Sequence, residues 1–280
     1  MKRGLEKTIE SNLRKSNLWT HKIKNDCKAQ NVFLAIRNNQ VDLYHKGGRL
    51  FCFDGNGFKT HLKYASVIIA NGKDYLTESE LSGYRLASDF ETNYQRIKEN
   101  CSNYSRIEAS GVSDLYHKHS YLSDRNDVVV LDIEVSFESL NEKNKQDRID
   151  ILLYNKDSKT LQFIEAKHYS NKEIWSKTTP EVISQIKRYE SQIAKRKPKI
   201  LLEYSEYVRI LNRIFNITLP EPKDIEDKVA LLIFGFDNDQ RDGRLKKLIT
   251  KKTEYSGIKN YSIGNIKQVV TENLWKAKVL

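Results

Sequence analysis

The chain has 280 residues, of which 39% are hydrophobic and 30% charged, and its 48 Lys and Arg against 37 Asp and Glu give a formal charge of +11. This length and the patterned apolar runs indicate a folded protein of one large or two small domains and exclude a disordered chain. The three cysteines are too far apart for a metal motif or a disulfide framework, and no apolar stretch is long enough for a membrane span. We therefore expect a cytoplasmic protein without membrane contact, whose basic excess either favours polyanionic partners or reflects a Lys-rich composition alone.

Residues 1–75 are expected to form a β-rich N-terminal subdomain. An amphipathic pattern predicts a short helix over 5–14, and β-rich runs separated by Asn38-Asn39 and Lys46-Gly47-Gly48 predict an antiparallel meander over 31–70. No motif in this segment points to a function. A specificity element, a dimerisation surface and a regulatory cover all stay open for it.

Residues 76–280 are expected to form an α/β domain in which helices flank a mixed central β-sheet. A capping-box pattern from Thr77 to Glu80 predicts the start of a helix that continues to about Asn100. The other expected elements, in chain order, are a helix over 105–120, strands over 127–137, 148–155 and 161–169, a helix opened by Thr179, a second helix after an interruption at Pro198, a strand over 228–237, a basic helix over 240–252, a strand near 259–264 and a final helical stretch.

The segment LQFIEAKHY, residues 161–169, places an acid and a lysine, Glu165 and Lys167, inside an apolar strand pattern. Acid-x-Lys occurs five times in the chain, but only here within such a strand. Strand alternation puts both side chains on one face. A buried charge must be paired or bind an ion, because desolvating it alone is costly. The pair is therefore either a plain ion pair or part of an active site.

The preceding strand, RIDILLYN at 148–155, carries a further acid, Asp150, ahead of its apolar run. A short turn joins the two strands, so we expect an antiparallel hairpin. Asp150 lies early on the first strand and Glu165 late on the second, so both carboxylates should meet at one end of the sheet beside Lys167. Oxygen ligands of this kind suit Mg²⁺ or Mn²⁺. A lysine next to such an ion can orient a water or stabilise a charged transition state.

This arrangement resembles the D…(D/E)xK set of the PD-(D/E)XK nuclease superfamily, which has the restriction-endonuclease-like fold, over roughly residues 75–265. The resemblance implies that Asp150 and Glu165 ligate a metal ion and that Lys167 assists the attacking water. Ile149 stands where the family name has its proline, which many members also lack.

Some members carry Gln-x-x-x-Tyr on the helix that follows the catalytic strands. Gln185 and Tyr189 have this spacing and share a helix face. The resemblance implies a catalytic role for both. A core tyrosine with a solvated glutamine beside it is the alternative.

Members often add another acid. We choose Glu134, because the alternation over 127–137 puts Asp132, Glu134 and Ser136 on the face opposite the apolar one. A solvent-facing acid is the other interpretation of Glu134. Glu91 and Glu99, on the expected helix, are further candidates for this ligand.

Three residues near the motif are candidates for substrate binding. Arg148 shares a strand face with Asp150 and would contact a phosphate or pair with an acid. His168 and Lys172 follow Lys167 and would contact the substrate, although loop composition alone explains them equally well. His117 and His119 do not share a helix face at their spacing and do not indicate a zinc site.

We therefore expect a Mg²⁺- or Mn²⁺-dependent nuclease that hydrolyses phosphodiester bonds. The superfamily is mostly DNA-directed, which favours DNA over RNA, and it suggests a role in defence against foreign DNA. The alternative is a catalytically inactive module of the same fold that binds nucleic acid or protein. A homodimer, a larger assembly and a partner protein stay open.

Overall fold

The computed structural model describes residues 2–66, 77–81, 85–137, 148–175, 180–251 and 253–279. The chain divides into two compact units. Gly4–Ser113 forms one, called here the N-terminal unit, and Asp114–Leu280 with Met1–Arg3 forms the other, called the sheet unit. The division falls inside α6 (Ile107–Lys118) and not near residue 75, where the composition changes.

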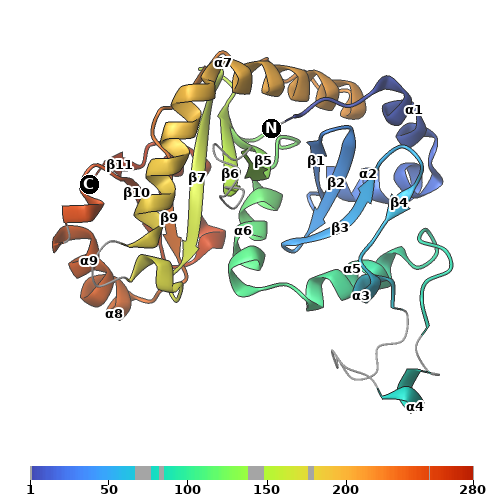
Figure 1. The fold of residues 1–280 in the computed structure, drawn as a ribbon, viewed down its shortest axis with the longest axis horizontal. Helices are drawn as coiled ribbons and strands as arrows, with labels where there is room; N and C mark the ends of the chain where they lie inside the picture. The colour runs from blue at the N-terminus through green and yellow to red at the C-terminus, as the bar shows by residue number, and fades with distance from the viewer. Residues whose placement is uncertain are drawn as a thin grey trace. The chain divides into compact units, whose positions relative to one another are not determined.

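The N-terminal unit contains the expected antiparallel meander, with its strands in the order β1-β2-β3-β4 (Figure 1). Helix α5 packs on β2, β3 and α3, so the unit extends well past the meander. Its elements are α1 (Lys7–Lys15), a π-helical turn (Trp19–Ile23), α2 (Lys24–Lys28), β1 (Phe33–Arg37), β2 (Gln40–His45), β3 (Gly48–Phe53), β4 (Phe58–Lys59), α3 (Leu62–Ala65), α4 (Glu78–Leu81) and α5 (Tyr94–Asn103).

The strand character expected to reach residue 70 is wrong after β4. Leu62–Ala65 is a short helix instead, and residues 67–70 lie outside the described part of the chain. His61 caps this helix, because its ring nitrogen accepts a hydrogen bond from the backbone N–H of Lys63 at 3.1 Å.

The continuous helix expected from Thr77 to about Asn100 is also wrong. Helix α4 follows Thr77 directly, but residues 85–93 are not helical. The side chain of Glu80, the other residue of the expected capping box, is not among the described ones. Asp89 holds a turn there by accepting hydrogen bonds from the backbone N–H groups of Glu91 and Thr92. Aspartate competes in this way with helix formation, so α5 begins only after the turn.

The sheet unit contains a mixed sheet with the strand order β11-β10-β9-β7-β6-β5, and β8 pairs with β7. Strands β5, β6 and β7 are antiparallel, whereas β7, β9 and β10 are parallel. Its elements are β5 (Val128–Ser136), β6 (Arg148–Asn155), β7 (Thr160–His168), the 3-10 turn η2 (Lys172–Ile174), α7 (Glu181–Phe215), β8 (Asp224–Ile225), β9 (Ala230–Phe234), α8 (Asn238–Gln240), the π-helical turn η3 (Arg241–Leu245), α9 (Lys246–Lys251), η4 (Thr253–Tyr255), β10 (Lys259–Ile263), η5 (Ile266–Gln268), α10 (Thr271–Trp275) and β11 (Lys278–Val279).

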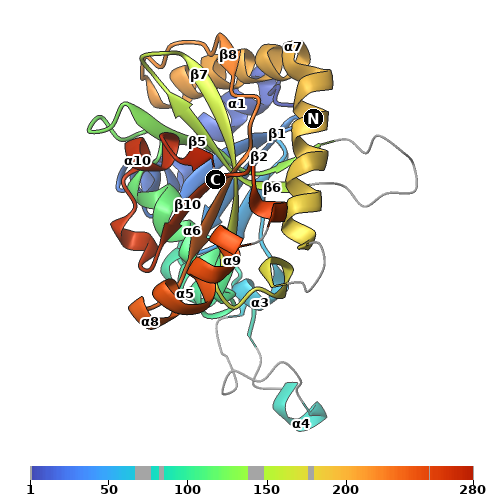
Figure 2. The same cartoon turned by 90° about the vertical axis from the view of Figure 1, so that its left-hand side faces the viewer.

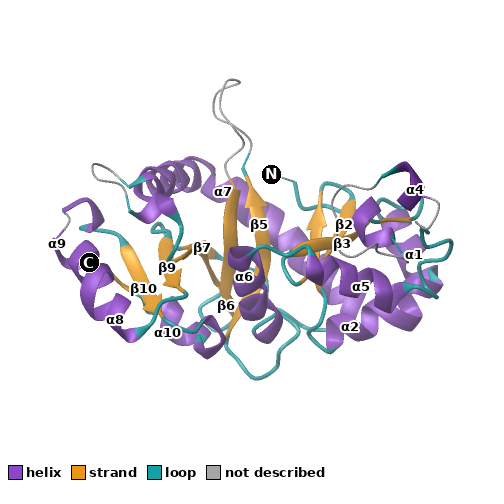
Figure 3. Cartoon of the chain, turned by 90° about the horizontal axis from the view of Figure 1, so that it is seen from below, coloured by secondary structure: helices purple, strands orange, loops and turns teal. Residues whose placement is uncertain are grey.

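Helices cover both faces of this sheet. Helix α7 lies on one side and α10 on the other, as Figures 2 and 3 show. Every residue of β9 is buried, as its continuous apolar sequence predicted for a strand covered on both faces. The expected mixed sheet flanked by helices is thereby confirmed, and the short strands β8 and β11 are additions to it.

Helix α7 is one element of 35 residues, so the interruption expected at Pro198 is wrong. Proline removes one backbone hydrogen bond and bends a helix, and α7 bends near its middle (Figure 1). Buried Ile193 and Ile200 lie on either side of the proline, so packing continues across the bend. Thr179, the expected N-cap, lies outside the described residues. None of the helices in the described part of the chain combines the length and the apolar character that a bilayer crossing requires.

Candidate active site

The hairpin of β6 and β7 brings the sequence motif together. The pairs Ile151–Ile164 and Leu152–Phe163 fix an antiparallel register that places Asp150 opposite Glu165. Asn155 closes the turn between the strands, because its side-chain oxygen accepts the backbone N–H groups of Asp157 and Ser158. The predicted hairpin is therefore confirmed, and its register follows from a tight turn and two apolar strands.

The Asp150 carboxylate is fixed on the neighbouring strand. Its Oδ2 accepts a hydrogen bond from the backbone N–H of Ala166 at 2.8 Å. Ala166 lies between Glu165 and Lys167 in the sequence, so this hydrogen bond fixes the Asp150 carboxylate beside the part of β7 that carries both residues. A hydrogen bond from a backbone N–H favours the charged form of a carboxylate.

Lys167 contacts two carboxylates. Its Nζ lies 2.9 Å from Oε1 of Glu165 and 2.5 Å from Oε2 of Glu173. The residue is only 6% exposed. Burial opposes the charged form, but the Glu165 and Glu173 carboxylates outweigh burial and raise the pKa of Lys167 above its ordinary value. Lys167 is therefore an ammonium ion at neutral pH.

Glu165 is buried with excess negative charge around it. It is 2% exposed, and its Oε2 is a buried atom without a hydrogen-bond partner among the described residues. Burial and then the Asp150 carboxylate raise the pKa of Glu165, against the opposing effect of Lys167. A carboxylate oxygen left in this way is costly unless it binds a proton or a cation.

Sequence reasoning missed Glu173. It lies in η2, directly after β7, where Asn171 caps the turn by accepting the backbone N–H of Glu173 at 3.0 Å. A single 3-10 turn has no apolar periodicity that would mark its side chains as inward or outward. The one available signal was an acid close behind the acid-x-Lys motif, with an Asn before it to start a turn.

Glu134 and Arg148 pair with each other. Glu134 stands opposite Asp150 between the pairs Ile133–Ile151 and Val135–Ile149, and its φ is +51°. Its Oε2 lies 2.7 Å from Nε of Arg148, and both side chains are partly exposed. Arg148 thus pairs with an acid, which is the second of its two predicted roles. Glu134 lies opposite Asp150 in the strand register, but its carboxylate contacts Arg148.

The helical alternatives for the third acid belong to the N-terminal unit. Glu91 contacts His21 there at 2.8 Å, and Glu99 contacts Arg96 at 3.8 Å. Both acids are thus engaged in surface pairs of their own.

Gln185 and Tyr189 lie one turn apart on α7, as expected. The Tyr189 hydroxyl donates a hydrogen bond to the backbone carbonyl of Arg148 at 2.8 Å, so the buried tyrosine anchors the start of β6, two residues before Asp150. The Gln185 side-chain oxygen is a buried atom without a hydrogen-bond partner among the described residues. Tyr189 therefore positions the strand that carries Asp150.

His168 and Lys172 have surroundings of their own. The His168 ring accepts the backbone N–H of Ser170, and its edge meets the ring of Phe234. Gly235 has a φ of +81°, and a Cβ there would overlap the His168 ring. Lys172 is exposed at the start of η2. The structure thus gives His168 a packing role and leaves Lys172 on the surface.

The carboxylates of the site are suited to a divalent cation that keeps part of its water. Among the described residues no group of three or more His, Cys, Asp or Glu side chains is arranged to hold a metal ion. Mg²⁺, however, is usually bound by one or two carboxylates together with waters and phosphate oxygens. Asp150 and the buried free oxygen of Glu165 supply that smaller set, so the site fits such an ion.

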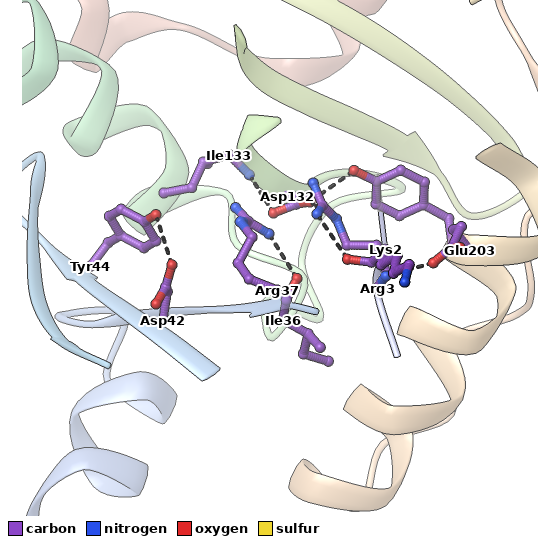
Figure 4. A network of polar contacts seen from close by, with 10 residues as sticks. Lys2, Arg3, Ile36, Arg37, Asp42, Tyr44, Asp132, Ile133 and Glu203 are labelled. Carbon is purple, nitrogen blue, oxygen red and sulfur yellow. Dashed lines mark hydrogen bonds and ion pairs between the residues drawn. The ribbon is translucent and has the colours of Figure 1, made fainter. Parts of the chain in front are cut away.

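A second buried charge on the sheet, Asp132, was also missed. Its Oδ2 lies 3.0 Å from Nε of Arg3 and 2.8 Å from the Tyr204 hydroxyl, which donates to it. Figure 4 shows this network, in which the backbone N–H of Arg3 also donates to Glu203. A bulge between Val130 and Asp132 shifts the register of β5. Beyond the bulge Asp132 and Glu134 share a face, as predicted, but Arg3 and Tyr204 contact Asp132, which is fully buried.

Comparisons of the chain with protein-family models, with curated proteins and with solved structures give no match. Membership of the PD-(D/E)XK superfamily therefore stays a prediction, supported by the arrangement of Asp150, Glu165 and Lys167 alone.

Proposed function

We propose that this chain is a metal-dependent nuclease of the PD-(D/E)XK type that hydrolyses phosphodiester bonds, with DNA as the favoured substrate. One observation carries the proposal. The buried Oε2 of Glu165 lacks a hydrogen-bond partner among the described residues, next to the anchored carboxylate of Asp150 and the ammonium of Lys167.

The charge of the cluster supports a divalent cation. Three carboxylates, those of Asp150, Glu165 and Glu173, surround the single ammonium of Lys167. Glu165 is the buried member, and burial together with the Asp150 carboxylate raises its pKa, so its charged form is unfavourable without a counter-ion. Mg²⁺ or Mn²⁺ bound there would polarise a phosphoryl group and lower the pKa of water.

Lys167, Asp150 and Glu165 would have different roles in hydrolysis. Lys167 is charged, so it acts as a donor and a positive charge and not as the base that takes a proton from water. The ammonium has three N–H groups, and two of them are enough for its ion pairs with Glu165 and Glu173. The third can hold a water or a non-bridging phosphate oxygen, where charge develops during hydrolysis. Asp150 and Glu165 would hold the cation on the same strand ends.

The test is cleavage of labelled single-stranded DNA, duplex DNA and RNA, each with Mg²⁺, with Mn²⁺ and with EDTA. Asp150→Ala and Lys167→Ala should lower the rate by at least about 100-fold, the usual effect of removing a charged catalytic group. Asp157→Asn is the matched control, because Asp157 belongs to another acid-x-Lys sequence at the turn of the same hairpin. Full activity of Lys167→Ala, with wild-type thermal stability, would overturn the proposal.

A nuclease-fold module that binds nucleic acid without cutting is the second candidate. The engagement of Lys167 by two carboxylates favours it, because such a lysine is also a satisfied buried ion pair. Binding without cleavage under every metal condition would support this candidate. A cytoplasmic location and a role in defence against foreign DNA extend the nuclease proposal by analogy with the superfamily.

A further inference from the structure

An arginine is stacked on a tryptophan close to the candidate active site. The guanidinium carbon of Arg244, in η3, lies 4.0 Å from the centroid of the Trp175 ring, just after η2. Close stacking of this kind is a cation–π interaction, and it holds a guanidinium in one plane. The contact joins the basic helical segment after β9 to the turn after β7.

The tryptophan is itself held in place. Its Nε1–H donates a hydrogen bond to the backbone carbonyl of Tyr169 at 2.6 Å. The rings of Tyr169 and Trp175 also pack edge to face, with their centroids 4.9 Å apart. Tyr169 in turn donates its backbone N–H to the carbonyl of Phe234 on β9. Trp175 is thus a fixed platform on the sheet, and Arg244 rests on it.

The segment around this platform carries exposed positive charge. Arg244, Lys246 and Lys247 are all exposed, and none of the three forms an ion pair with a carboxylate among the described residues. Arg241, in the same helical turn, is instead paired with Asp242 at 2.9 Å. The π-helical geometry of η3 is rare and occurs often at functional sites.

The platform lies within reach of Lys167. Glu173 contacts Lys167 directly, and Trp175 follows Glu173 by two residues, so their Cα atoms are at most about 7 Å apart. Lys167 is thus linked to Arg244 through Glu173 and Trp175, two residues of one short segment.

We propose that Arg244, stacked on Trp175, binds the phosphodiester backbone of the nucleic acid that enters the candidate site, with Lys246 and Lys247 adding positive charge. The inference rests on the proposed function, because it names the surface that holds the substrate. Stacking leaves the N–H edge of the guanidinium free for a bidentate contact with phosphate. It also restricts the side chain before binding, which lowers the entropy lost on association.

The test is fluorescence anisotropy with labelled single-stranded DNA, duplex DNA and RNA, using the full chain in EDTA so that metal-dependent cleavage does not occur. Arg244→Ala should weaken binding about 10-fold and lower the dependence of log affinity on log salt by about 0.7–0.9, the value for one phosphate contact. Arg244→Lys keeps the charge but loses the planar guanidinium that stacks on Trp175. Its affinity should therefore lie between those of the wild type and Arg244→Ala. Arg241→Ala, the matched control, should bind within about 2-fold of the wild type, since its charge is already paired.

The outcomes separate the two proposals. If Arg244→Ala and Trp175→Ala bind as tightly as Arg241→Ala with an unchanged salt slope, the inference is overturned even if the wild type cleaves DNA with Mg²⁺. If Arg244→Ala weakens binding while no substrate is cleaved under any metal condition, the inference stands and the nuclease proposal fails. Thermal unfolding of each variant excludes a loss of fold as the cause.

Discussion

Glu173 Oε2 lies 2.5 Å from Nζ of Lys167, so a turn outside the strand motif supplies the lysine with a second carboxylate. The sequence motif alone pairs Lys167 only with Glu165. With both acids present, the ammonium is held from two directions and keeps its charge even when one acid binds a cation. Glu173 is therefore a positioning residue for Lys167.

Replacement of Glu173 by Gln should lower kcat by about 10- to 100-fold with little change in KM, the usual effect of losing a residue that orients a catalytic group. Gln keeps a hydrogen bond but loses the charge that holds the ammonium. Steady-state cleavage kinetics with Mg²⁺ measure this. Glu181→Gln, an exposed acid at the start of α7, is the control and should retain wild-type kcat. Equal kcat values for the two variants would contradict the role of Glu173.

Replacement of Glu165 by Gln should stabilise the metal-free protein at alkaline pH while it abolishes cleavage. Burial and Asp150 raise the pKa of Glu165, so the folded state retains a proton that the unfolded state releases above the ordinary pKa near 4.5. As the pH rises from the ordinary pKa to the raised pKa of Glu165, the free energy of unfolding of the wild type therefore decreases. The loss is about 1.4 kcal/mol for each unit by which the pKa is raised. Gln has no such dependence.

Thermal unfolding in EDTA at pH 5 and pH 8 checks the Glu165 prediction. The advantage of the Gln variant should be larger at pH 8, and Mg²⁺ should raise the midpoint of the wild type only. A variant that unfolds at a lower temperature than the wild type at pH 8 would contradict the charge argument.

Removal of Arg3 should destabilise the sheet unit far more than removal of its exposed neighbour. Arg3→Ala takes away the cation paired with fully buried Asp132, and breaking such a pair costs about 3–5 kcal/mol. Lys2→Ala, the control, should change the free energy of unfolding by less than about 0.5 kcal/mol. Chemical denaturation measures both, and adding Asp132→Asn to Arg3→Ala should recover part of the loss. Equal stability of the two single variants would refute the pairing.

The contribution of His119 to the free energy of unfolding should fall as the pH drops from 7 to 5, opposite in sign to that of Glu165. Burial lowers the pKa of His119, whose Nε2–H donates to the carbonyl of Val269 at 3.0 Å. Below the ordinary value near 6.5 the unfolded state binds a proton that the folded state rejects, so stability is lost with acidification. His45 is shifted in the same direction, again chiefly by burial.

Chemical denaturation at several pH values between 5 and 7 tests the histidine prediction. The quantity to compare is the change in the free energy of unfolding with pH, and not its absolute value. His119→Gln should remove the His119 contribution, so its stability relative to the wild type should increase as the pH falls, because Gln does not titrate. Parallel curves for wild type and His119→Gln would argue against it.

Tyr189→Phe should reduce both stability and activity, whereas Tyr154→Phe should reduce stability alone. Each hydroxyl donates to a backbone carbonyl, Tyr189 to Arg148 and Tyr154 to Pro220, and each loss costs about 1 kcal/mol. Only Tyr189 fixes the end of β6 that carries Asp150. Unfolding and cleavage measured on both variants give the comparison, and equal kcat values would remove the positioning role.

The hairpin was predictable because its signals are local. Alternating apolar residues set the strands, the turn set the register, and the charges of Asp150, Glu165 and Lys167 interrupted the pattern visibly. Glu173 was not predictable, because a single turn has no period. The burial of Asp132 was missed for a different reason: Arg3 and Tyr204, both far away in the sequence, contact it, and neither contact has a local signal.

Pro198 shows the limit of propensity. Its cost inside a helix is about 3 kcal/mol, which favours a break when the segment is considered alone. Ile193, Ile200 and Tyr204 are buried on both sides of it, and full burial of each apolar side chain stabilises by about 1.5–3 kcal/mol. Packing therefore outweighs the lost hydrogen bond, and α7 bends instead of ending.

The discontinuous course of the sheet unit bears on how this protein can be dissected. A fragment that begins at Asp114 contains every strand of the large sheet and the whole candidate site, yet it lacks Arg3. It would bury the Asp132 carboxylate without the arginine that neutralises it, and its poor folding would be mistaken for dependence on the N-terminal unit. An excised sheet unit should therefore carry Asp132→Asn, or receive residues 1–3 as a separate peptide, before its activity is compared with that of the full chain.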